Sequence, residues 1–154
     1  MKNLNLKFIF FLVFIFKALE AEHLIKSEKF ESFYVKSAIT TDEKSRGLMN
    51  VESLEDSTGM IFIYDFPSIV NFWMYKTSLN LDIIFIDNNK KIVSIKNGKP
   101  FSTEIISSEK PVIAVLEIPF NCSNKIGLKI GMSIEWIPFK SVNKKKKINL
   151  CKKL

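Results

Sequence analysis

Three side chains in this sequence have the chemistry to bind an anion or move a proton: Arg46, Asp82 and Glu117. Arg46 is the only arginine among 23 basic residues. A guanidinium group presents five donors in a planar fork that matches a carboxylate or a phosphate, whereas a lysine ammonium is a point charge. Arg46 is therefore a candidate anion-binding residue at the edge of a pocket. The alternative is a structural ion pair.

Asp82 and Glu117 each lie inside an apolar run that predicts a strand. Alternate residues of a strand share a face, which places Asp82 beside Ile84 and Glu117 beside Val115. A charge on an apolar face is costly unless it is paired or hydrogen-bonded, so we expect Arg46 to contact one of these carboxylates. A second interpretation makes Asp82 and Glu117 a general acid and base, as in glycoside hydrolysis.

The run from Phe72 to Tyr75 directs large side chains to both faces of a predicted strand. One face should join the core, and the other lines a groove for an apolar or carbohydrate ligand. Lys76 and Thr77 follow directly and offer polar contacts. The candidate binding residues are therefore Arg46, Trp73, Thr77 and Asp82. The alternative is that both faces of this strand pack under neighbouring loops.

The two cysteines, Cys122 and Cys151, are too few for a thiolate metal site. In an oxidising compartment they could pair and attach the end of the chain to the domain; the alternative is two free thiols. The only histidine, His23, falls in a segment that we expect to be mobile. We therefore expect no His-based catalysis, no metal and no cofactor.

These residues need a scaffold, and the patterning predicts a mostly β fold of the α+β type. We expect a compact single-domain β-sandwich or barrel-like sheet with one or two short helices. Thr40 and Glu43 form a capping box that starts a helix over 40–49. The predicted strands are 33–39, 59–64, 70–75, 81–86, 92–96, 112–118 and 130–139. Residues 87–90 predict a hairpin turn between 81–86 and 92–96, because the Asx residues in this stretch tolerate a positive φ.

The first 21 residues read as a secretory signal sequence. Lys2 and Lys7 precede an unbroken apolar run over 8–16, and residues 19–21 offer a cleavage site. That run is too short to span a bilayer, which needs roughly 20 apolar residues. We therefore predict a periplasmic or secreted bacterial protein; the alternatives are a buried first strand or an uncleaved anchor. Residues 22–32 are predicted to be a loose lead-in to a domain at 33–139.

The net charge of +7 is unevenly distributed. Residues 22–139 carry 13 basic and 15 acidic side chains, whereas residues 140–154 carry seven lysines and no acid. The tail is predicted to be disordered, with possible attraction to anionic lipid head groups. Nucleic acid is a poor partner for an exported domain without a basic patch, and we expect a monomer.

Four stretches match one family pattern in order. They are Arg46-Gly47-Leu48-Met49, Gly59-Met60-Ile61-Phe62, Phe72-Trp73-Met74 continuing through Thr77 to the run 81–87, and the run 115–119. Together they resemble the domain of unknown function 192 family, whose proteins often follow signal peptides. The resemblance covers residues 33–139 and implies a compact, mostly β domain. Two departures are Lys76, where the family usually has Asn, and Gly131-Met132, where it usually has Gly-Asp.

The function that we expect is a ligand-binding or partner-binding module of the cell envelope, for a small molecule or an envelope protein. The alternative is a hydrolytic enzyme that uses Asp82 and Glu117, with Arg46 holding an anionic substrate group.

Overall fold

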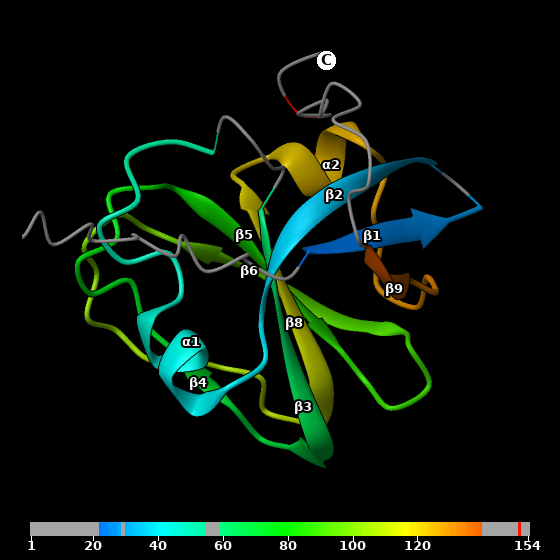
Figure 1. Cartoon of the computed structure of the whole chain (residues 1–154), viewed down its shortest axis with the longest axis horizontal. Helices are drawn as coiled ribbons and strands as arrows, with labels where there is room; N and C mark the ends of the chain where they lie inside the picture. The colour runs from blue at the N-terminus through cyan, green and yellow to red at the C-terminus, as the bar shows by residue number, and fades with distance from the viewer. Residues whose placement is uncertain (1–21, 29, 55–58, 140–150, 152–154) are drawn as a thin grey trace, which may run out of the picture.

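A computed structural model describes residues 22–28, 30–54, 59–139 and 151. Across these residues the chain is mostly β, as predicted, and one seven-stranded sheet curls into half a barrel (Figure 1). Its strands are β1 (Glu22–Ser27), β2 (Phe30–Ala38), β3 (Met60–Ser68), β5 (Leu81–Ile86), β6 (Ile92–Gly98), β8 (Val112–Pro119) and β9 (Glu135–Phe139). They lie in the order β6-β5-β8-β3-β2-β1-β9, and of the neighbouring pairs only β2 and β3 run parallel.

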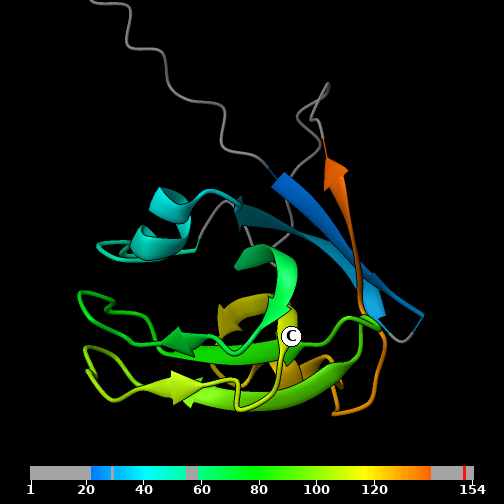
Figure 2. The same cartoon turned by 90° about the horizontal axis from the view of Figure 1, so that it is seen from below.

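Two short helices and a small ribbon complete the described part of the chain. The helices are α1 (Thr41–Arg46) and α2 (Cys122–Lys125). The ribbon pairs β4 (Asn71–Phe72) with β7 (Ile106–Ser107), which lie side by side in Figure 2.

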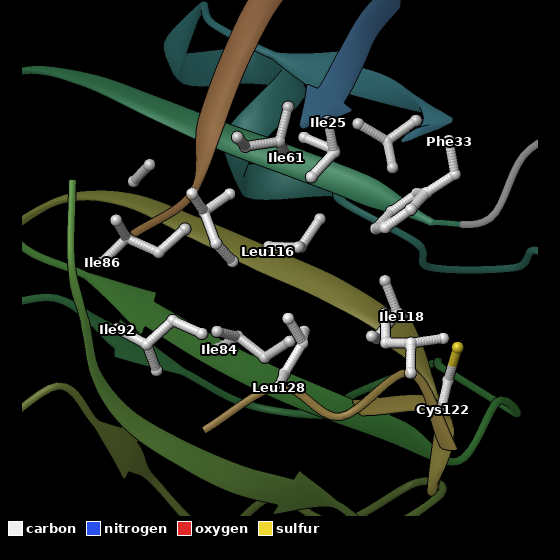
Figure 3. Packing of buried hydrophobic residues seen from close by; sticks show 14 residues of the cluster. Ile25, Phe33, Ile61, Ile84, Ile86, Ile92, Leu116, Ile118, Cys122 and Leu128 are labelled. Atoms are coloured by element: carbon white, nitrogen blue, oxygen red, sulfur yellow. The ribbon is translucent and has the colours of Figure 1, made fainter. Parts of the chain in front are cut away.

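The central strands β5 and β8 are buried on both faces. All six residues of β5 are buried, so its sequence shows an apolar run rather than an alternation. One face of β5 contributes Ile84 and Ile86 to a cluster that also contains Leu116, Ile118 and Cys122 (Figure 3). We call this cluster the inner core.

The opposite face of the sheet packs into a second cluster, which we call the outer core. It contains Ile83 and Phe85 from β5 and Val115 from β8. Leu48 and Met74 cover these strands from the segments that follow α1 and β4. The two apolar layers therefore lie on opposite sides of one sheet.

Helix α1 begins with the predicted capping box. The Thr40 hydroxyl accepts a hydrogen bond from the Glu43 amide at 3.3 Å, and the Glu43 carboxylate accepts one from the Thr40 amide at 2.8 Å. Hydrogen bonds from the amides of Thr40 and Ile39 to this carboxylate lower the pKa of Glu43. The helix is shorter than predicted because Gly47, at a φ of 47°, ends it after Arg46.

The predicted hairpin between β5 and β6 is confirmed. Asp87 accepts hydrogen bonds from the amides of Asn89 and Lys91, each at 2.9 Å, and Lys90 takes a φ of 58°. This Asx-type turn reverses the chain and allows β5 and β6 to pair antiparallel.

The predicted loose lead-in at 22–32 is wrong. β1 pairs with both β2 and β9, and it buries His23 and Ile25 at 5% and 0% exposure. His23 therefore lies in a strand and not in a mobile segment. The sequence of β1 has only two inward-facing positions, His23 and Ile25, and this is too short an alternation to distinguish a strand from a polar loop.

Two other predicted strands are shorter in the structure. Of the predicted strand 70–75, only Asn71–Phe72 pairs, because its partner β7 is two residues long. Of 130–139, only Glu135–Phe139 is strand; Gly131, at a φ of 89°, lies in a turn before it.

The predicted signal sequence and all of the basic tail except Cys151 lie outside the described residues. Among the residues that are described, no helix is both long enough and apolar enough to span a membrane.

Candidate functional site

Glu117 lies in the middle of the outer-core face of the sheet. Its neighbours across the strands are Met60 on β3 and Ile83 on β5. The residue is only 4% exposed, and within the described part of the chain no hydrogen bond or ion pair reaches its carboxylate. Burial therefore raises the pKa of Glu117 to about 8. This carboxyl group is mainly protonated and uncharged at neutral pH.

The stretches that predicted the family meet on the same face. The amide of Asn50, just after α1, donates to the Lys76 carbonyl at 2.8 Å, and the Ser78 hydroxyl donates to the Val51 carbonyl at 3.2 Å. These two bonds join the segment after Arg46 to the segment after Trp73.

Aromatic packing joins the same segments through the core. Phe72 meets Phe62 edge to face at 4.9 Å between ring centroids, and Phe85 at 6.1 Å. Gly47 lies against the Phe62 ring, since a Cβ at that position would be 3.1 Å from it. These aromatic and glycine residues of the pattern therefore pack the outer core.

Trp73 and Tyr75 point away from this core. Met74 between them is 1% exposed, whereas Trp73 and Tyr75 are 49% and 42% exposed. Their rings lie 5.3 Å apart at an interplanar angle of 36°. The ammonium group of Lys76 lies 5.2 Å from the centre of the Tyr75 ring. One face of the 72–75 run joins the core and the other is exposed, which is one of the two arrangements that the sequence left open.

Thr77 holds the turn that follows this aromatic pair. It is 5% exposed, its hydroxyl donates to the Tyr75 carbonyl at 3.2 Å, and its amide donates to the Met74 carbonyl at 3.0 Å. Lys76 takes a φ of 53° at the tip of the turn. Thr77 thus positions Tyr75 and Lys76.

Asp82 lies on the other side of the sheet. It is opposite Ile118, an inner-core residue, whereas Glu117 is opposite Ile83 of the outer core. The Asp82 carboxylate accepts hydrogen bonds from the amides of Asn121 and Ser123 at 3.1 and 2.9 Å and from the Ser123 hydroxyl at 2.6 Å. Its oxygens fix the start of α2.

This register separates the two candidate acid–base residues. Adjacent positions on paired strands point to opposite faces, so Asp82 and Glu117 do not converge on one cleft. The geometry gives the acid–base interpretation no support.

The expected contact between Arg46 and a buried carboxylate is also absent. Arg46 is exposed at the end of α1, and the described residues contain no ion pair between it and Asp82 or Glu117. The Asp82 carboxylate accepts hydrogen bonds instead, and the Glu117 carboxyl group is mainly uncharged at neutral pH. The Arg46 side chain is exposed at the surface.

Cys122 and Cys151 are joined by a disulfide, with their Cα atoms 5.5 Å apart. Cys122 is 1% exposed in the inner core, and Cys151 packs against the same cluster. The described residues hold no group of three or more His, Cys, Asp or Glu that could bind a metal ion.

The sequence reasoning missed one surface beside the aromatic pair. In the ribbon, Phe72 pairs with Ile106, and both pack against the outer core. The next residue outward on each chain is Trp73 and Ile105, and these are 49% and 65% exposed. The signal was available in Phe101 and Ile105, but no pattern showed that this segment pairs with 70–77.

Backbone hydrogen bonds join the two segments that carry this surface, 69–77 and 99–110, at both ends. The Ser108 amide donates to the Val70 carbonyl at 2.9 Å, and the Phe101 amide donates to the Thr77 carbonyl at 2.9 Å. We call the exposed apolar side chains along these two segments the ribbon face. It comprises Ile69, Trp73, Tyr75, Phe101 and Ile105, at 59%, 49%, 42%, 64% and 65% exposure.

Comparison with known proteins places this geometry in a family. A model of DUF192, described as uncharacterised ACR, matches residues 23–136. The chain belongs to the DUF192 family. The match begins at His23, ten residues before the predicted start, and so includes β1.

Solved structures with the same fold include two bacterial proteins. A proposed transcription regulator from Sinorhizobium meliloti 1021 is 28% identical, with a TM-score of 0.68, over 76% of this chain and 93% of its own. A protein of unknown function from Novosphingobium aromaticivorans DSM 12444 is 30% identical, with a TM-score of 0.65, over 75% of this chain and 84% of its own. Among curated proteins, no relative matches this DUF192 chain.

Proposed function

We propose that this DUF192 protein is an exported binding module of the cell envelope and that the ribbon face is its binding surface. The observation that carries the proposal is the exposure of Trp73 and Tyr75 on a segment whose backbone pairs with the segment of the exposed Phe101 and Ile105. Soluble monomers seldom expose contiguous large apolar side chains unless these serve an interaction. Trp and Tyr are also the residues that most often anchor binding surfaces.

Export is supported by three separate observations. The apolar run at 8–16 and the predicted cleavage after Ala21 fit a secretory signal. β1 covers Glu22–Ser27, so cleavage after Ala21 would leave every described strand intact. The joined pair Cys122–Cys151 fits an oxidising compartment.

Regulation of transcription, which the description of the Sinorhizobium meliloti protein names, is not favoured for this chain. Residues 22–139 carry 15 acidic and 13 basic side chains, which is a poor charge for a domain that must bind DNA phosphates.

Cosedimentation of the mature protein (residues 22–154) with isolated bacterial envelopes tests the proposal. We expect the protein to pellet with the envelopes and the double variant Trp73→Ala, Tyr75→Ala to stay in the supernatant. Ile130→Ala is the matched control, because Ile130 is 67% exposed outside the ribbon face. Equal pelleting of the double variant and the wild type, with both folded by circular dichroism, would rule the ribbon face out.

A further inference from the structure

The composition of the ribbon face indicates what it touches. Ile69, Phe101 and Ile105 are purely apolar and 59–65% exposed, whereas Trp73 and Tyr75 are amphipathic and about half exposed. Aliphatic and Phe side chains enter the acyl region of a bilayer, and Trp and Tyr concentrate at its head-group level. Both kinds of side chain lie on the two segments that the ribbon joins.

The charges around the ribbon face are complementary to an anionic surface. The segments 69–77 and 99–110 contain three lysines, Lys76, Lys99 and Lys110, and two glutamates, Glu104 and Glu109. Glu109 is already paired with Lys96 of β6. The lysines therefore outnumber the remaining acid, and lysines near an anionic bilayer favour binding.

From these observations we propose that the ribbon face docks onto the surface of an anionic lipid bilayer, with Ile105, Phe101 and Trp73 inserted between the head groups. This proposal rests on the proposed function and names the partner of the same surface.

Two other partners fit the surface less well. A sugar ring stacks on one aromatic face and needs polar side chains for its hydroxyls, so Ile69, Phe101 and Ile105 would stay in contact with water. A second copy of this chain would bring Lys76, Lys99 and Lys110 toward their own counterparts, and like charges across an interface oppose association.

Flotation with vesicles tests the lipid proposal. The probes are vesicles of phosphatidylcholine mixed with phosphatidylglycerol and vesicles of phosphatidylcholine alone, each with the disulfide-bonded mature protein. We expect binding to the mixed vesicles and weaker binding to phosphatidylcholine alone. Trp73→Ala with Ile105→Ala should lower the partition coefficient about tenfold or more, because each change removes apolar area that the bilayer would bury. Ile130→Ala should bind like the wild type.

A variant with the four lysines at 144–147 changed to glutamine separates the ribbon face from the tail. If this variant loses all binding while the Trp73→Ala, Ile105→Ala variant binds normally, the tail and not the ribbon face is responsible and the lipid proposal is overturned.

Two further outcomes separate this proposal from the proposed function. Binding to envelopes but to neither vesicle would overturn the lipid proposal and leave an envelope glycan or protein as partner. If the wild type binds no vesicles but forms concentration-dependent dimers, and Trp73→Ala with Ile105→Ala abolishes those dimers, the ribbon face binds a second copy of the chain and the lipid proposal is overturned. If the wild-type protein binds neither envelopes nor vesicles, both proposals are overturned.

Discussion

At the scale of single residues, Glu117 shows how one carboxyl group changes state when it is buried without a partner. Its position among Met60, Ile83 and Val115 offers no cation, and protonation is the less costly solution. The protonated Glu117 side chain is therefore a buried, uncharged polar group among the apolar side chains of the outer core.

The pKa of Glu117 predicts how stability depends on pH. Folded Glu117 keeps its proton up to about pH 8, whereas the unfolded chain releases it near the ordinary value of 4.5. Its contribution is complete below pH 4.5 and is lost as the pH rises toward 8. The free energy of unfolding should fall there by up to about 1.4 kcal/mol per pH unit. Glu117→Gln mimics the protonated form and should flatten this slope in urea denaturation; equal slopes for both proteins would show that Glu117 is not buried.

Arg46 and Asp82 predict opposite responses to conservative substitution. Because Arg46 is exposed and contacts neither carboxylate, Arg46→Lys should change the free energy of unfolding by less than about 0.5 kcal/mol. Asp82→Asn should cost roughly 1–3 kcal/mol, since an amide nitrogen would face the donors at 121 and 123. Chemical denaturation measures both; a large loss for Arg46→Lys would revive the buried ion pair.

At the scale of elements, two glycines let strands and turns approach closely. A Cβ at Gly59 would lie 1.9 Å from the carbonyl oxygen of Glu117, where β3 meets β8. A Cβ at Gly98 would lie 2.6 Å from the Met74 sulfur, which is the end of a flexible side chain. The Glu117 carbonyl belongs to the backbone of a paired strand and cannot move freely, whereas the Met74 side chain can change its conformation.

These contacts predict a ranking of two matched variants. Gly59→Ala should lower the free energy of unfolding by about 3 kcal/mol or more, because β3 and β8 must separate locally. Gly98→Ala should cost about 1–2 kcal/mol, because Met74 can repack. Thermal denaturation compares them, and a reversed order would contradict the close approach of β3 and β8.

The sequence predicted elements where a local signal was complete. The capping box at Thr40 and the Asx turn at Asp87 satisfy their hydrogen bonds within a few residues, so one segment contains the whole interaction. The inward and outward alternation of 72–75 also held, although the strand itself is only two residues long. Side-chain direction follows from backbone pleating and needs no long ladder.

Long-range register decided what the sequence could not. Asp82 and Glu117 both sit on apolar faces, as predicted, but only the pairing of β5 with β8 shows that these faces are opposite. The expected contact of Arg46 with a carboxylate failed for the same reason, because it depended on the position of α1 relative to β5 and β8. The ribbon face was missed because segments 69–77 and 99–110 are joined by long-range backbone pairing that no local pattern shows.

At the scale of the whole molecule, the disulfide connects the end of the chain to the inner core. It closes a span of 29 residues and joins Cys122, in the segment whose start the Asp82 carboxylate holds, to Cys151. The disulfide therefore attaches Cys151 covalently to the inner core of the half-barrel.

We predict that the Cys122–Cys151 bond is present in the purified mature protein and stabilises it. Cys151→Ser should lower the free energy of unfolding by about 2–4 kcal/mol, and adding a reductant to that variant should have no further effect. Intact mass with and without reductant should differ by two hydrogens in the wild type. Two free thiols in protein purified from the periplasm would contradict the bond.

The central claim is that Trp73 lies on a surface that the cell envelope covers. Replacing Trp136 with Phe leaves Trp73 as the only tryptophan, because the chain has two. Acrylamide should quench its fluorescence readily in the free protein, since the side chain is 49% exposed, and much less once bacterial envelopes are added. Equal quenching with and without envelopes, under conditions where the protein pellets with them, would contradict the account.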